Sequence, residues 1–140
     1  MVYQRVVFLI LMIELNDLLQ FLKLHGFPVN FWVVGENKTE DITDLVNNIR
    51  NAACHIRSPL RKFDPYELEY ASNILGPGAM IHLIGPGVTY AISNKTVDDI
   101  GFAFGVRMIF AKADIGPAIA AARDRLYALG KANGFSTFGI

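Results

Sequence analysis

Hydrophobic positions along the chain recur with two spacings, one typical of helix faces and one typical of strands. Four leucines share the i, i+3, i+4, i+7 spacing of one helix face: Leu15, Leu18, Leu19 and Leu22. Gly26 suits the end of this first helix. The aromatic and β-branched segment 29–34 then predicts a strand, which Gly35 ends.

The pattern returns to helical spacing after this strand. Thr39 is a suitable N-cap, and Glu40 and Asp41 place negative charge in the first turn. The apolar face of this second helix comprises Ile42, Leu45, Val46, Ile49, Ala53 and Ile56. A third helix is predicted over 64–75, because its opening Asp-Pro-Tyr-Glu supplies an N-cap, a first-turn proline and the glutamate of a capping box.

The longest uninterrupted apolar run, 6–13, predicts a buried strand because it is rich in Val, Ile and Phe. It is far shorter than the roughly 20 residues of a membrane-spanning helix. Two alternatives stay open: the run could be the core of a signal peptide, or Met12 could be the true initiator.

The second half of the chain is richer in strand signals. Gly-Pro-Gly occurs at 76–78 and again at 85–87, and the second copy suits the bend of an antiparallel hairpin of strands 79–84 and 88–93. A further strand is predicted over 102–110 from alternating large side chains. Asp114 then caps a last helix, with Pro117 in its first turn, whose apolar side comprises Ile115, Ile119, Ala122, Leu126 and Leu129.

This order of elements predicts one α/β (α+β) domain over 1–140, with a central, mostly antiparallel sheet of about five strands covered by helices. Apolar residues make up 52% of the chain and charged residues 19%, which favours self-association. Because 13 basic residues balance 13 acidic ones, we expect neither nucleic-acid nor membrane binding. The lone Cys54 indicates a reducing cytoplasmic location, and with the apolar content it suits a thermophile.

Two segments resemble the roadblock/LC7 (longin-like) family. One is a helix followed by a strand, ELNDLLQFLKLHGF and VNFWVV, and the other is the strand and helix RMIFAKADIGPAIAAARDRLYALG. The resemblance covers about two thirds of the chain, although the family's second strand, hairpinned to the first, is not evident between 35 and 39, and the segment 57–78 is long. It implies a roadblock/longin-like or profilin-like sandwich that homodimerises and binds small Ras-like GTPases or acts as a scaffold. It implies no catalytic residues.

His82 is the histidine with most functional interest. It lies within an apolar strand, so we expect it to be either a hydrogen-bonded core residue or part of a ligand pocket. Such a pocket would include Tyr90, Gly85 and Gly87. The two Gly-Pro-Gly segments are otherwise expected to form turns, since neither is followed by the residues of a phosphate-binding loop.

The other reactive residues have structural interpretations. Cys54 and His55 are neighbours on a helix and do not face each other, so Cys54 is expected to be a structural cysteine beside the apolar face. His25 is expected at a helix end, and the acidic pairs at 40–41 and 98–99 are expected to be exposed. Gly101 is expected where a ligand or another backbone approaches the strand, or at a bulge.

We therefore expect no catalytic residue, metal site or cofactor, and the sequence favours a non-enzymatic regulatory or scaffolding module. It would homodimerise, with two copies of helix 42–56 or of helix 115–129 meeting across a dimer axis, and bind a protein partner such as a small Ras-like GTPase. The alternative is a small-molecule or nucleotide-binding domain, possibly an enzyme, with a pocket near His82.

Overall fold

The computed structural model describes residues 2–34, 39–54, 62–63, 68–69, 73–85, 88–104 and 107–135. Its helices are α1 (Val2–Leu24), α2 (Ile42–Cys54) and α3 (Gly116–Ala132), and a π-helical turn, Ala111–Ile115, leads into α3. The strands are β1 (Trp32–Val34), β2 (Thr39–Asp41), β3 (Lys62–Phe63), β4 (Leu68–Glu69), β5 (Asn73–Leu75), β6 (Met80–Gly85), β7 (Val88–Ser93), β8 (Gly101–Phe104) and β9 (Arg107–Phe110).

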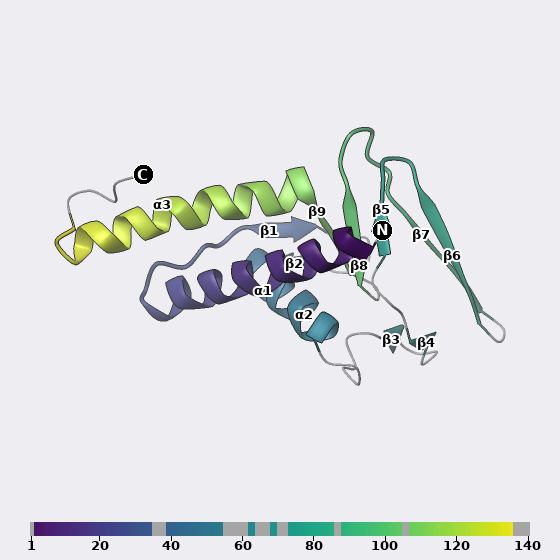
Figure 1. The fold of residues 1–140 in the computed structure, drawn as a ribbon, viewed down its shortest axis with the longest axis horizontal. Coiled ribbons are helices and arrows are strands. Elements are labelled where there is room, and N and C mark those ends of the chain that lie inside the picture. The colour runs from purple at the N-terminus through teal and green to yellow at the C-terminus, as the bar shows by residue number, and fades with distance from the viewer. Residues whose placement is uncertain are drawn as a thin grey trace.

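The helices gather at one end of the molecule and most of the strands at the other (Figure 1). α1 contacts both α2 and α3, and one face of α1 supplies much of the core with Phe8, Met12, Leu15, Leu19 and Leu22. The ring of Phe8 stacks on that of Phe102, with centroids 3.9 Å apart, so the first turns of α1 are joined to β8. None of the helices in the described part of the chain is long and apolar enough to cross a membrane.

All described strands pair antiparallel, in sheets β1-β2, β3-β4, β5-β8-β9 and β6-β7. The predicted α+β class is therefore confirmed, but a single central sheet of about five strands is not, since the largest of these sheets has three strands. The physical reason is that β6 and β7 are the longest strands and are paired with each other along their whole length.

The predicted strand at 6–13 is wrong, because this segment is helical and belongs to α1. Phe8 and Met12 continue, toward the N-terminus, the 4-3-4-3 spacing of the buried leucines that follow, so one helix face runs through both segments. An apolar run without polar interruptions does not distinguish a strand from a helix. In this segment, the helical spacing that it shares with the leucines after it is what distinguishes a helix from a strand.

The start of α2 differs from the prediction by a few residues. Thr39 lies in β2, and the N-cap bond is instead made by Asp41, whose Oδ1 accepts from the Thr43 backbone N at 2.9 Å. The apolar face is confirmed at four of its six positions: Ile42, Leu45, Val46 and Ile49 are buried. Ala53 is only partly buried, and Ile56 lies outside the described residues.

The predicted third helix is wrong at 68–69 and 73–75, which are strands β4 and β5. The predicted capping box, at 64–67, lies outside the described residues. β5 pairs with β8 in the register Leu75 to Gly101, a contact between distant segments that local helix signals do not reveal. Non-local strand pairing therefore prevails over the local propensity here.

The hairpin predicted at 79–84 and 88–93 is confirmed as β6 and β7. The single strand predicted over 102–110 is instead two, β8 and β9, which pair with each other. The last helix is confirmed, but it continues through Gly130 to Ala132. Its predicted cap, Asp114, lies in the π-helical turn instead, and the N-cap residue of α3 is Ile115. Ala122 is buried as predicted, whereas Ile119 is exposed and Ala118 is buried in addition, because small side chains allow α3 to approach α1 closely.

Candidate functional site

The proposed pocket residues lie on the β6-β7 hairpin. His82 pairs with Ala91, Tyr90 with Leu83, and Gly85 with Val88, whereas Gly87 lies outside the described residues. His82 is exposed, so its predicted place in the core is wrong. Among the described residues, the hairpin packs on the core through Ile81 and Ile92, which lie on the opposite face from His82. The pocket itself stays a prediction.

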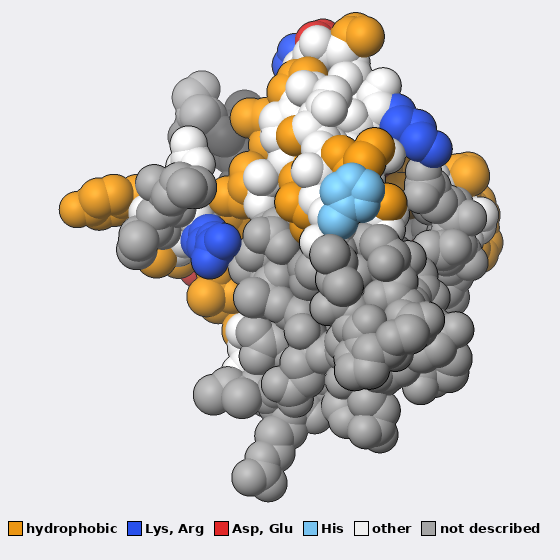
Figure 2. All heavy atoms as spheres, turned by 90° about the vertical axis from the view of Figure 1, so that its right-hand side faces the viewer, with side chains coloured by type: hydrophobic (Ala, Val, Ile, Leu, Met, Phe, Trp, Pro, Cys, Tyr) orange, Lys and Arg blue, Asp and Glu red, His pale blue; other side chains and the backbone are white. Residues whose placement is uncertain are grey.

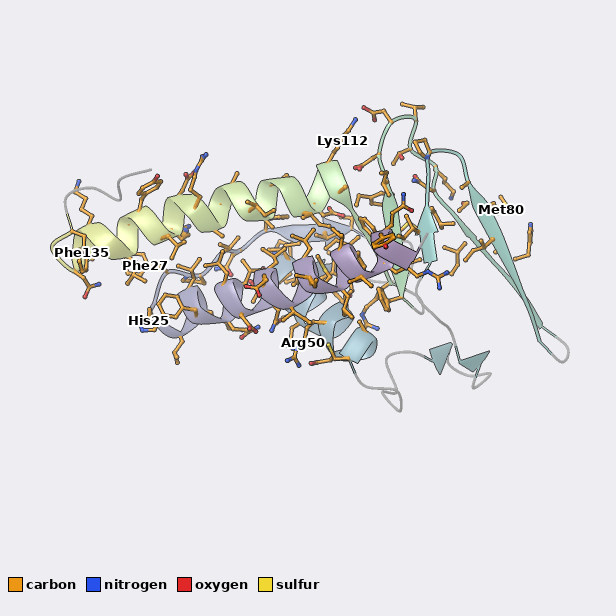
Figure 3. All side chains as sticks on the ribbon, in the orientation of Figure 1. His25, Phe27, Arg50, Met80, Lys112 and Phe135 are labelled. Carbon is orange, nitrogen blue, oxygen red and sulfur yellow. The ribbon has the colours of Figure 1, made fainter. Side chains whose placement is uncertain are left out.

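The remaining reactive side chains are separated from His82. His25 directly follows α1, at the opposite end of the molecule from β6, and its Nδ1 lies 2.9 Å from the Phe21 carbonyl oxygen (Figure 3). Cys54 is the last residue of α2 and is exposed, so it does not pack beside the apolar face as predicted; Ala52, two residues earlier, is buried there. His55 lies outside the described residues. Among the described residues, no three His, Cys, Asp or Glu side chains are grouped as metal ligands would be.

Asp99 is buried, contrary to the exposed turn predicted for it, whereas its neighbour Asp98 is exposed as predicted. The Asp99 carboxylate accepts from the backbone N of Ile100 and Lys112, each at 2.8 Å, and from that of Ala113 at 2.9 Å. Burial tends to raise the pKa of Asp99, but these backbone donors outweigh burial and the pKa lies below its ordinary value. The charge thus anchors the start of the π-helical turn.

Asp114 lies in the same turn and has the opposite electrostatic environment. Its Oδ2 accepts from the Phe110 backbone N at 2.7 Å. Burial raises the pKa of Asp114, a shift that the Phe110 bond opposes and the negative charge of Asp99 increases. Of the two carboxylates that bond to this part of the backbone, Asp99 lies in an environment that favours the ionised form and Asp114 in one that disfavours it.

Asn94 holds the segment between β7 and β8 in place. Its Nδ2 donates to the carbonyl oxygens of Leu75 at 2.9 Å and Asp99 at 2.8 Å, and its Oδ1 accepts from the Thr96 hydroxyl at 2.6 Å. Asn94 is almost completely buried, so its polar atoms serve internal bonds. Through these bonds the segment connects the end of β5, the start of β8 and the π-helical turn before α3. Lys112, whose backbone N donates to Asp99, lies in that turn (Figure 3).

Glu40 is also buried, contrary to the exposed helix start predicted for it. Its Oε2 lies 3.2 Å from the Nε of Arg107, and its Oε1 lies 3.3 Å from Nη2 of the same guanidinium. Asn48 donates to Oε1 at 2.9 Å. Only 7% of the Glu40 side chain and 14% of the Arg107 side chain are exposed, so this is a buried ion pair that connects β2 to β9. The sequence Thr-Glu-Asp of β2 has no hydrophobic alternation that would indicate this burial, since the partner Arg107 is 67 residues away.

Gly101 is closely covered, but by side chains where a ligand or another backbone was predicted. A Cβ there would lie 2.8 Å from the Met108 Sδ and 3.1 Å from the Phe110 Cε1, both on β9. The space at this glycine is therefore filled by side chains of the neighbouring strand.

The exposed feature that the sequence analysis missed is an apolar patch on α1. It consists of Tyr3, Val6, Val7 and Ile10, which are 85%, 48%, 63% and 53% exposed. Their i, i+3, i+4, i+7 spacing places them on one helix face, opposite the buried Phe8 and Met12. We call this surface the outer α1 patch. The signal was the same apolar run that predicted a strand.

Apolar surface of this kind is unusual in a helix that meets water on one side. A helix that is hydrophobic all round is normally covered on all sides, and clustered exposed apolar side chains mark interaction sites. The face continues toward the C-terminus with two exposed acids, Glu14 and Asp17, which limit the patch.

Comparisons of the chain with protein-family models, curated proteins and solved structures found no match.

Proposed function

We propose that this chain is a non-enzymatic regulatory or scaffolding module that homodimerises and binds a protein partner, such as a small Ras-like GTPase. The observation that carries the proposal is the outer α1 patch, four exposed apolar side chains on one helix face. Three of the buried polar side chains, Glu40, Asn94 and Asp99, favour a structural over a catalytic interpretation, because each is engaged in internal bonds that join the elements.

Three features support the likeness to the roadblock/LC7 family and thus the choice of partner. β2 pairs with β1 as a hairpin, which supplies the strand that the sequence pattern lacked. The final strand β9 leads into the last helix through a turn that contains Asp114. The ion pair between β2 and β9 brings the two small sheets together, as a sandwich would require.

The partner surface can be tested with two matched double variants on α1. Val7→Gln with Ile10→Gln makes the outer α1 patch polar, and Phe21→Gln with Leu24→Gln makes the same change at exposed positions near the other end of the helix. Titration of each protein with purified small Ras-like GTPases, loaded with GDP or a non-hydrolysable GTP analogue, gives the affinities.

We expect binding to weaken about tenfold or more for the first double variant and less than about threefold for the second, because apolar contacts at the interface centre dominate affinity. Equal effects of both double variants would contradict the role of the outer α1 patch. Absence of binding by any GTPase of the panel would contradict this choice of partner.

A further inference from the structure

The β6-β7 hairpin extends away from the helices and forms a sheet of its own (Figure 1). Its two six-residue strands are paired continuously, from Met80 with Ser93 to Gly85 with Val88, without a bulge. One face of the hairpin packs on the rest of the molecule, because Ile81 and Ile92 contact the cluster of Leu75 and Ala103. The opposite face, which carries His82 and Ala91, is exposed. A two-stranded hairpin needs further strands or packed faces for stability, so this uncovered part of it is where an additional strand would stabilise it.

The register shows which backbone groups are available at the β6 edge. The Asn94 backbone N donates to the Ala79 carbonyl oxygen at 2.8 Å, so this pair is of the hydrogen-bonded kind. Hydrogen-bonded and non-hydrogen-bonded pairs alternate along an antiparallel ladder. The N–H and C=O groups of Met80, His82 and Ile84 therefore point to the outer edge of β6, with which no strand among the described residues pairs.

This edge lacks the features that usually protect a free strand. Exposed edges commonly carry Lys, a mid-strand Pro or a bulge, which prevent pairing with other chains. Here the sequence between Glu69 and Lys95 contains no charged residue. Met80 and His82 are exposed on β6, and Figure 2 shows hydrophobic side chains next to the histidine on the described part of this face.

We propose that the outer edge of β6 pairs antiparallel with β6 of a second copy of this chain, about a twofold axis, to form a four-stranded sheet. An uncharged strand can face its own copy without like-charge repulsion, whereas a charged strand cannot. A twofold axis also closes the assembly, so the pairing stops at two copies. The inference rests on the homodimer of the proposed function and names its interface.

The twofold axis determines which residues meet. An axis perpendicular to the sheet keeps each strand face on the same side, so alternate residues of β6 face alternate residues of the second β6. Because β6 is Met80–Gly85, His82 lies at or next to the axis. A charge introduced at His82 would therefore lie close to its own copy.

The test compares His82→Lys with Ala91→Lys in the full chain. Ala91 is exposed and pairs directly with His82, so its variant adds the same charge to the same face but one strand away from the edge. Light scattering across a dilution series gives the dissociation constant of the dimer. We expect His82→Lys to raise this constant about tenfold or more and Ala91→Lys to raise it less than about threefold, since opposed like charges disfavour strand pairing.

Hydrogen exchange of the unmodified chain provides a measurement that does not depend on how the variants fold. The backbone amides of Met80, His82 and Ile84 should be protected at concentrations where the dimer forms and exchange faster on dilution. A dimer whose strength is unchanged by His82→Lys, or weakened more by Ala91→Lys, would overturn the β6 interface while leaving the homodimer intact. A monomer at all concentrations would overturn both the β6 interface and the homodimer of the proposed function. The same conclusion would hold if the hairpin of a monomeric chain bound lipid vesicles or a strand of another protein.

Discussion

The ion pair between Glu40 and Arg107 is the contact through which β2 and β9 hold each other. Removing one partner of a buried ion pair leaves a charge without that compensation, which is more costly than losing an exposed pair. We expect Arg107→Leu to lower the free energy of unfolding by about 3 kcal/mol. The control Lys23→Ala removes an exposed pair with Asp44 and should change it by less than about 0.5 kcal/mol. Urea denaturation measures both, and similar losses in the two variants would contradict the buried link.

The carboxylates of Asp99, which bonds to the π-helical turn, and Asp114, which lies in it, should give opposite dependences of stability on pH. The lowered pKa of Asp99 means that its charge stabilises the fold above the unfolded-state value of about 3.9, and that this stability is lost as pH falls. Asp99→Asn should therefore cost about 2 kcal/mol at pH 7 and less at pH 3. At both pH values, urea denaturation gives the difference from the unmodified chain.

Asp114 has the reverse sign. Because burial raises its pKa, the folded state binds the proton more tightly than the unfolded chain, and stability falls as pH rises from about 3.9 through the folded-state pKa. Asp114→Asn removes this cost and can still accept from the Phe110 backbone N. Its stability relative to the unmodified chain should increase between pH 3 and pH 7. A relative stability that decreases over this range would contradict the assignment.

At the scale of elements, the first three turns of α1 combine a core face and an outer face. Phe8 is buried and stacked on Phe102, whereas Val7 is mostly exposed. Phe8→Ala should lower the free energy of unfolding by about 3 kcal/mol, because it leaves a cavity in the core. Val7→Ala should change it by less than about 0.5 kcal/mol. If thermal and urea denaturation gave equal small effects for both variants, the segment before Met12 would not contribute to the core.

The elements that could be predicted from the sequence are those with local signals. The hairpin of β6 and β7 follows from one Gly-Pro-Gly between two strand-like runs, and α2 follows from its apolar spacing. β5 could not be predicted in the same way, because its conformation depends on pairing with the distant β8. The start of α1 has a local signal, the spacing of Phe8 and Met12 with the leucines that follow, but its uninterrupted apolar run is equally typical of a strand. For the candidate site, the sequence correctly placed His82 on a strand of the hairpin. Its exposure could not be predicted, because it depends on which described elements pack on the hairpin, and local sequence patterns do not reveal such packing.

At the scale of the whole molecule, the burial of the acidic residues also depends on contacts between segments that are distant in the sequence. Glu40 and Asp99 are followed by helix and turn signals that suggest exposure, yet their donors come from β9 and from the start of the π-helical turn. The outer α1 patch and the β6 edge belong to different elements, so one surface can serve a partner and the other a second copy. This division of surfaces is what a scaffolding module requires.

The position of the hairpin between β5 and β8 has a consequence for how the chain folds. β5 must find β8 across the whole intervening segment, Leu75 meeting Gly101, and the entropy of closing such a loop opposes this step. A hairpin with a short turn forms in about 1–10 μs, and once formed it brings the two ends of the segment together. The uncharged edge of β6 would then be present before β5 and β8 have paired. Newly made copies can therefore meet through this edge early in folding, so local protein concentration during synthesis would influence whether dimers or larger aggregates result.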